Sequence, residues 1–256
     1  MTTVRLDLAY DGTAFRGWAA QRGQRTVQGV LEHALERILG EGIKLSVAGR
    51  TDTGVHARGQ VASFGIGRGV DLVRLRRGVN GILGPEVVVR EARLASVDFD
   101  ARFSATAREY RYRIDLGEVV DPFTARFVWH RPGDLALAPM RSGGRALLGE
   151  HDFAAFSRAP ERGSTVRRLE RLSVTRSGDR LEISARANAF AHQMVRSIVG
   201  TLVAVGEGRI AAERIPEILA SRDRSNAGQP APAHGLALER VIYGTRRSTS
   251  PESDSA

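Results

Sequence analysis

The sequence predicts a mixed α/β (α+β) fold made of two tandem ferredoxin-like halves that share a largely antiparallel sheet. Stretches in which apolar and polar residues alternate indicate strands, and stretches with apolar residues at helical spacing indicate helices. These stretches follow the order β-α-β-β-α-β, the ferredoxin-like unit, twice within the 256 residues. We expect one half over residues 1–105, a second over 106–244, and a polar, Ser-rich, disordered tail over 245–256.

The N-terminal half begins with a strand over 4–10, where apolar residues alternate with polar or small ones. Thr26 is a candidate N-cap for a helix over 27–39, whose apolar residues recur at helical spacing. Gly40 is suited to end that helix. The other elements expected in this half are strands over 43–48, 60–66 and 87–94 and a helix over 72–82.

The C-terminal half begins with a strand over 109–114, on which Tyr110 and Tyr112 share one face. Near its end, Asn188 is a candidate cap for a strongly apolar helix over 189–205. The other elements expected in this half are a helix over 135–148, strands over 169–175 and 180–187, a helix over 211–220 and a closing strand over 236–243.

The charge of the chain favours a polyanionic partner. The formal net charge is +9, and Lys44 is the only lysine, so arginine supplies almost all of the positive charge. Arginine binds phosphate in a bidentate manner and stacks on bases. Basic clusters recur along the whole chain, which is typical of a protein that binds nucleic acid. The alternative is a compositional bias toward arginine, with solvated faces and no partner.

Several classes of protein are excluded by composition and motifs. The absence of cysteine excludes disulfides, Cys-ligated zinc and iron–sulfur clusters. The chain has no apolar run of about 18 residues that would predict a membrane span, and no secretory signal pattern. We therefore expect a cytoplasmic protein. No metal-ligand spacing, Walker loop, dinucleotide fingerprint or nucleophile elbow occurs. Any chemistry must come from a carboxylate without metal or cofactor, which suits reactions at a glycosidic bond.

The stretch 49–57, GRTDTGVHA, joins two expected strands and contains the candidate catalytic residue Asp52. Asp and Gly are favoured in any tight turn, so a bracing role is the alternative. Arg196 favours a functional role, because an arginine in an apolar helix needs a partner unless it reaches solvent. Pairing with Arg196 would keep Asp52 ionised, as a nucleophile must be. His56 is a candidate general base, although a single histidine in a turn is more often structural.

Tyr110 is a candidate substrate-binding residue. It lies in the run 107–113, AREYRYR, where aromatic side chains alternate with charged ones. This pattern is typical of surfaces that read RNA, with rings stacking on unpaired bases and guanidinium groups meeting phosphates. The alternative is an amphipathic strand whose tyrosines face the core.

Seven blocks of residues, in order, resemble the TruA-type tRNA pseudouridine synthases, and the resemblance extends from about residue 4 to residue 244. The blocks are Tyr10-Asp11-Gly12 with Gly17-Trp18, Thr26-Val27-Gln28, the stretch 48–57 with Gly59-Gln60-Val61, the stretch 105–108 with Tyr110-Arg111-Tyr112, the stretch 149–153, Asn188-Ala189-Phe190 with the stretch 192–196, and the stretch 233–236.

The resemblance implies conversion of uridine to pseudouridine at tRNA positions 38, 39 and 40, in the anticodon stem-loop, by a homodimer without metal or organic cofactor. It implies the pseudouridine synthase fold, with Asp52 as the nucleophile and Arg196 as its partner. It also implies that Tyr110 lies against the target base, that Arg50 assists in flipping the nucleotide, and that Leu236 closes the pocket. Two alternatives remain open: a non-catalytic RNA-binding module, and a synthase that acts on another RNA.

Overall fold

The structure is a computed structural model that describes residues 2–158 and 163–244, so the tail expected over 245–256 lies outside the described residues. The elements up to residue 95 are β1 (Thr2–Tyr10), α1 (Val27–Leu39), β2 (Ser46–Val47), β3 (His56–Ile66), α2 (Leu72–Leu83) and β4 (Val87–Ala95). Those that follow are β5 (Ala105–Asp115), β6 (Trp129–His130), α3 (Leu137–Arg145), β7 (Gly149–Asp152), β8 (Val166–Ser177), β9 (Arg180–Ala187), α4 (Met194–Gly206), α5 (Ile215–Ser221) and β10 (Leu236–Tyr243).

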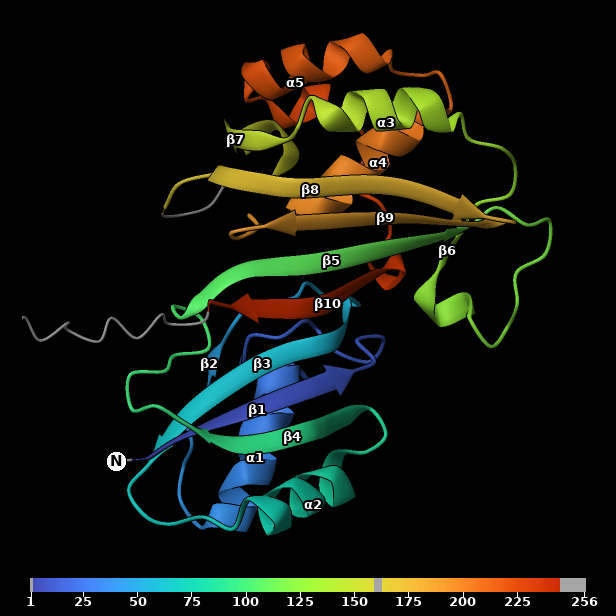
Figure 1. Cartoon of the computed structure of the whole chain (residues 1–256). Helices are drawn as coiled ribbons and strands as arrows, with labels where there is room; N and C mark the ends of the chain where they lie inside the picture. Colours follow the sequence, from blue (N-terminus) through green and yellow to red (C-terminus); the bar gives the residue numbers. More distant parts are fainter. Residues whose placement is uncertain (1, 159–162, 245–256) are drawn as a thin grey trace, which may run out of the picture.

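The described strands form one ten-stranded sheet, whose main path runs β4-β1-β3-β10-β5-β9-β8-β7 (Figure 1). Within each half, the four strands of the β-α-β-β-α-β unit take the same spatial order, β4-β1-β3-β2 and β10-β5-β9-β8. The halves meet where β10 pairs with β3 in parallel, at His56 and Ala57. The other pairs along the main path are antiparallel. The predicted fold class is therefore confirmed.

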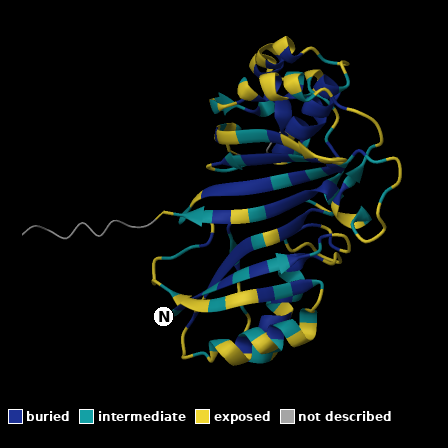
Figure 2. Cartoon of the chain, turned by 45° about the vertical axis from the view of Figure 1, so that its right-hand side comes forward, coloured by how far each residue is buried: buried dark blue, intermediate teal, exposed yellow. Residues whose placement is uncertain are grey.

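One face of the sheet carries the core, and the helices cover it. On β1, Leu6 and Leu8 are fully buried, whereas Arg5 and Asp7 project to the other face and form an ion pair of 2.6 Å. In Figure 1, α1 and α4 lie behind the sheet. Figure 2 shows that buried residues concentrate along the central strands, and exposed residues on the outer helices and loops. The longest described helices have 13 residues, too short to cross a bilayer.

Three predicted elements differ in extent from those of the structure. The strand expected over 43–48 is reduced to Ser46–Val47, and the backbone N–H of Leu45 donates instead to the carboxylate of Glu32, at 3.0 Å. The helix expected over 135–148 covers only Leu137–Arg145. The helix expected over 211–220 is a 3₁₀ turn, Ala212–Arg214, followed by α5.

The prediction that Asn188 caps a helix over 189–205 is wrong. The helix α4 begins only at Met194, after Gln193, which has a left-handed backbone (φ 63°). The amide oxygen of Asn188 accepts hydrogen bonds from the backbone N–H groups of Arg168 and Ala189. The apolar residues before the helix are used differently, since the Phe190 ring packs edge-on against Tyr110 at 5.1 Å. The segment 188–193 is therefore a loop beside the active site rather than part of the helix.

Candidate active site

Asp52 stands in a tight turn of the loop 48–55, between β2 and β3, and main-chain hydrogen bonds hold this loop. The N–H of Val55 donates to the carbonyl of Asp52 at 3.1 Å, which closes the turn. The N–H of Trp18, a fully buried residue, donates to the carbonyl of Thr51 at 3.0 Å. The loop that follows β1 therefore packs against the turn and holds it in place.

Two glycines in the supporting loop allow this close approach. A Cβ atom on Gly17, whose φ is +87°, would lie 2.8 Å from the carbonyl oxygen of Thr51. A Cβ atom on Gly12 would lie 2.1 Å from the carbonyl oxygen of Val55. Both distances are below van der Waals contact, so the loop 48–55 sits where it does only because these two positions lack a side chain.

Buried polar side chains fix the loop from the core side. Gln60, fully buried on β3, donates to the carbonyl of Gly49 at 2.7 Å and to the hydroxyl of Tyr10 at 3.2 Å. The Tyr10 hydroxyl is also 2.8 Å from the Thr51 hydroxyl. Burial raises the pKa of Tyr10 to about 12, so it remains a neutral hydrogen-bonding group. Tyr10 and Gln60 lie in the motifs of the sequence, but nothing in the sequence indicates this bracing role.

Arg108 joins the loop 48–55 to the C-terminal half. Its buried guanidinium donates twice to the carbonyl of Ala48, at 3.0 and 2.8 Å, and once to the carbonyl of Asn188, at 2.7 Å. It also donates to the carbonyl of Arg102 at 2.8 Å. Burial lowers the pKa of Arg108. This arginine holds together the two segments that carry Asp52 and the start of α4, and sequence analysis missed that function.

The structure brings Asp52 and Arg196 together. Nη1 of Arg196 lies 3.5 Å from Oδ2 of Asp52, and Nε donates to the carbonyl of Ala231 at 2.7 Å. Every residue of α4 except Arg196 is buried. Its side chain is 17% exposed and that of Asp52 is 22% exposed. The aspartate is therefore reachable from solvent, while its cationic partner is fixed against the main chain.

Tyr110 is buried on β5, close to Asp52. A Cβ atom on Gly49 would lie 3.6 Å from the Tyr110 hydroxyl, so the loop 48–55 passes directly over this ring. Burial raises the pKa of Tyr110 far above its ordinary value, and the nearby Tyr10 and Asp52 add to this effect. The phenol is therefore a neutral donor at physiological pH.

A family model described as tRNA pseudouridine synthase matches residues 8–104 and 145–244. The two matched segments cover more than half of the chain and include Asp52 and Arg196. The chain belongs to the tRNA pseudouridine synthase family. It is therefore an isomerase that acts on uridine in tRNA, and the non-catalytic RNA-binding module left open by the sequence is excluded.

Individual relatives agree over nearly the full length. The tRNA pseudouridine synthase A of Geobacter sulfurreducens is 40% identical over 244 residues, which cover 95% of this chain and 100% of the relative. That of Chloroflexus aurantiacus is 46% identical, over 95% of this chain and 89% of the relative. Among solved structures, an H/ACA RNP bound to a substrate RNA matches 93% of this chain and 48% of its own, at 12% identity and a TM-score of 0.39. That likeness is too distant to support a conclusion.

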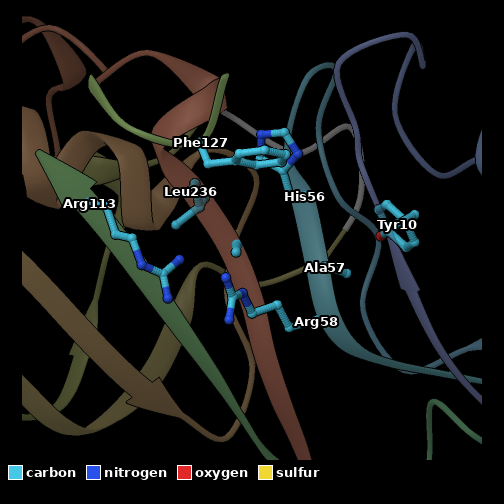
Figure 3. Close-up of a pocket in the computed structure, with 8 residues that line it drawn as sticks. Tyr10, His56, Ala57, Arg58, Arg113, Phe127 and Leu236 are labelled. Atoms are coloured by element: carbon cyan, nitrogen blue, oxygen red, sulfur yellow. The ribbon is translucent and has the colours of Figure 1, made fainter. Parts of the chain in front are cut away.

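The other two predicted site residues of the synthase are Arg50, on the same loop as Asp52, and Leu236, the first residue of β10. Arg50 is exposed, and no hydrogen bond or ion pair within residues 2–158 and 163–244 involves its side chain. Leu236 is buried at the start of β10, opposite Tyr112. It lines a pocket of about 110 Å³ whose walls include Arg58, Arg113 and Phe127 (Figure 3).

His56 has a structural role in the synthase, and it does not occupy the position of a general base. It is buried, its Nδ1 accepts the N–H of Gly12 at 3.0 Å, and its Nε2 lies 3.1 Å from the carbonyl of His234. Burial lowers its pKa, which favours the neutral ring that these two bonds require. The carboxylate of Asp11, 3.1 Å from Nδ1, opposes that shift without reversing it. His56 links the loop after β1 to the segment before β10.

Proposed function

We propose that this synthase acts on the anticodon stem-loop of tRNA, at positions 38, 39 and 40, with Asp52 as the nucleophile. The observation that carries the assignment is the position of Asp52. Its carboxylate is partly exposed at the tip of a braced turn, 3.5 Å from a fixed guanidinium and beside a buried tyrosine. The guanidinium of Arg196 carries the opposite charge to a carboxylate nucleophile and fixes the place of that carboxylate in the site.

The isomerisation requires no second reactant. The bond between N1 of uracil and C1′ of ribose breaks, a bond between C5 and C1′ forms, C5 loses its proton, and N1 gains one. Substrate and product contain the same atoms, so the net reaction consumes no oxidant or reductant. Asp52 would act by attack at C1′, by addition at C6 of the ring, or by proton abstraction that leads to a glycal. These routes share the same requirement for an ionised carboxylate beside the flipped nucleoside.

The other predicted residues have roles that follow from their positions. A stacked uridine is out of reach, so the nucleotide must turn out of the helix. Arg50, exposed on the same loop as Asp52, would occupy the space left behind or hold a phosphate. Tyr110 would contact the base, and its neutral phenol is suited to donate a hydrogen bond. Leu236, buried at the start of β10, would close the pocket around the uracil so that the detached base does not escape.

The setting of the reaction follows from the family and the charge. With a net charge of +9 carried almost entirely by arginine, we expect binding of tRNA to weaken steeply with added salt, because phosphate contacts release counterions. We further propose that the synthase works in the cytoplasm, and that it forms the homodimer that the resemblance implies.

Substitution of Asp52 by Asn tests the assignment of the nucleophile. The variant keeps the shape of the side chain but removes its charge, so we expect tritium release from 5-tritiated uridine in tRNA to stop, while tRNA binding changes little. Asp134→Asn is the matched control, because Asp134 is 87% exposed and paired with Arg176 on the surface. Turnover by Asp52→Asn at a rate near that of the control would remove Asp52 from its role.

Mapping of pseudouridine in tRNA separates the target positions from the chemistry. Unmodified tRNA incubated with the enzyme should gain pseudouridine at positions 38, 39 and 40 only. Pseudouridine at other positions would leave the family and the nucleophile in place and overturn the proposed site of action.

A further inference from the structure

His192 is the second cationic or hydrogen-bonding side chain at Asp52. Its Nε2 lies 3.4 Å from Oδ1, whereas Arg196 approaches the other oxygen, Oδ2, at 3.5 Å. We propose that His192 is a positioning residue, which holds the Asp52 carboxylate in the orientation needed for reaction. The proposal rests on the proposed role of Asp52 as the nucleophile.

Contact with both oxygens has a consequence that a single ion pair lacks. A carboxylate held through one oxygen can still pivot about that contact by a combined rotation about its Cα–Cβ and Cβ–Cγ bonds, which displaces the other oxygen. A donor on the second oxygen, from a separate residue, restricts that rotation. Reaction rates are sensitive to displacements of about 1 Å at the reacting atoms, so a restricted carboxylate is the faster one. The imidazole presents an Nε2–H to this oxygen when the ring is protonated or in the neutral tautomer that carries its proton on Nε2.

The backbone on both sides of His192 is fixed, although the side chain of His192 is exposed. The carbonyl of His192 accepts the N–H of Arg158 at 3.0 Å. The next residue, Gln193, has a φ of +63°, a conformation that residues other than glycine rarely adopt and that clusters at functional sites. Its carbonyl accepts the N–H of Ser197, in the first turn of α4. The disfavoured turn separates His192 from α4 and leaves its ring beside Asp52.

His192 and Arg196 differ in burial, so the role of His192 can be tested by substitution without disturbing the fold. Arg196 is mostly buried and bonded to the main chain, so its loss would also affect folding. The side chain of His192 is 47% exposed, and among the described residues its only ion-pair partner is Asp52. Substitution of His192 should therefore leave the fold intact and act on the reaction alone. The competing role for an exposed histidine is contact with an RNA phosphate, which would contribute to binding instead.

The experiment compares His192→Ala, which removes the donor, with His192→Gln, whose amide nitrogen reaches about as far from Cα as Nε2. The control is His33→Ala, an exposed histidine on α1. Single-turnover rates at saturating enzyme and the Kd for tRNA are measured for each. We expect His192→Ala to react about tenfold more slowly, as for loss of a hydrogen bond to a charged group, with an unchanged Kd. We expect His192→Gln to recover most of the rate.

Three outcomes would overturn the proposal. In the first outcome, the rate of His192→Ala equals that of His33→Ala, which would mean that the contact has no function. The Kd for tRNA rises while the saturated rate is unchanged, so His192 binds phosphate. His192→Gln is as slow as His192→Ala, so the imidazole itself takes part in the reaction. Failure of the nucleophile is a separate result, because an active Asp52→Asn variant would reveal it whatever His192 does.

Discussion

Asp52 and Glu109 are two carboxylates that each have two basic side chains beside them, but they lie in different surroundings. Each has a different cation or donor on each oxygen: His192 and Arg196 for Asp52, at 3.4 and 3.5 Å, and two arginines for Glu109, at 3.3 and 2.8 Å. Glu109 is next to Tyr110 on β5, so their side chains project to opposite faces of the sheet. The pairs of charges alone do not distinguish these two sites.

What differs between the two sites is how far the carboxylate itself is exposed. At Glu109 the carboxylate is 9% exposed, and its partners Arg171 and Arg240 are 59% and 63% exposed. At Asp52 the carboxylate is 22% exposed and lies between Arg196 at 17% and His192 at 47%, so one of its two partners is about as buried as the carboxylate. Glu109 also lies within a strand that is paired on both sides, whereas Asp52 is at the tip of a turn. A partly exposed carboxylate beside a fixed guanidinium suits a reactive group, and a buried carboxylate between two exposed arginines suits a structural link between strands.

Substitution of the arginine beside each carboxylate should give the largest difference between the two sites. Arg196→Met removes the fixed guanidinium from Asp52, and we expect the single-turnover rate of pseudouridine formation to fall about a hundredfold to a thousandfold, as when one preorganised donor is removed from an active site. Arg240→Met, the matched control at Glu109, should leave the rate within about twofold of wild type, because exposed ion pairs contribute little. Equal rates for the two variants would show that the Asp52–Arg196 pair is structural.

Removal of the charge of Glu109 should have a smaller effect, and this effect should be on stability and not on the reaction rate. Glu109→Gln removes the charge between Arg171 and Arg240, and we expect the free energy of unfolding to fall by about 1 kcal/mol, since both arginines remain solvated. Urea denaturation measures the change, and tritium release should be unaltered. A loss of activity as large as that caused by Asp52→Asn would place Glu109 in the site and end the distinction.

The fold was predictable to the extent that each strand or helix depends on its own residues. The closing strand over 236–243 and the first helix over 27–39 are found as predicted, because their apolar periodicity and caps are local. The error over 189–193 has a non-local cause. Phe190 packs on Tyr110, and the carbonyl of Asn188 is bonded by Arg108, so these residues take a loop conformation against their own helical pattern.

The candidate site was predictable where charge was out of place in the sequence. Arg196 drew attention because its helix is otherwise apolar, and the structure places it beside Asp52. The residues that brace the turn gave no such signal. Arg108 resembles any arginine on a charged strand, and its carbonyl partners, Ala48 and Asn188, are far away in sequence. His192 was part of a motif, but its distance from Asp52 depends on the backbone turn at Gln193.

His56 is buried and His192 is exposed, a difference like that between the two carboxylates. The burial of His56 should be visible in the pH dependence of stability. Burial lowers the pKa of His56 in the folded state, while the unfolded chain has the ordinary value of about 6.5. Above that pH both states are neutral at His56. As the pH falls below about 6.5, the unfolded chain takes up the proton first, so the free energy of unfolding must fall until the folded ring is also protonated.

Thermal unfolding between pH 7.5 and 5.5 tests this smallest effect. We expect His56→Asn, which keeps an acceptor for the N–H of Gly12, to have a lower Tm at pH 7.5 but a shallower decline toward acid than wild type. The slope should be reduced without disappearing, because burial also lowers the pKa of His234. His33→Asn, at an exposed position on α1, should keep the full slope. An undiminished slope in His56→Asn would mean that the buried ring is not the group that titrates, and that His56 and His192 differ less than their burial implies.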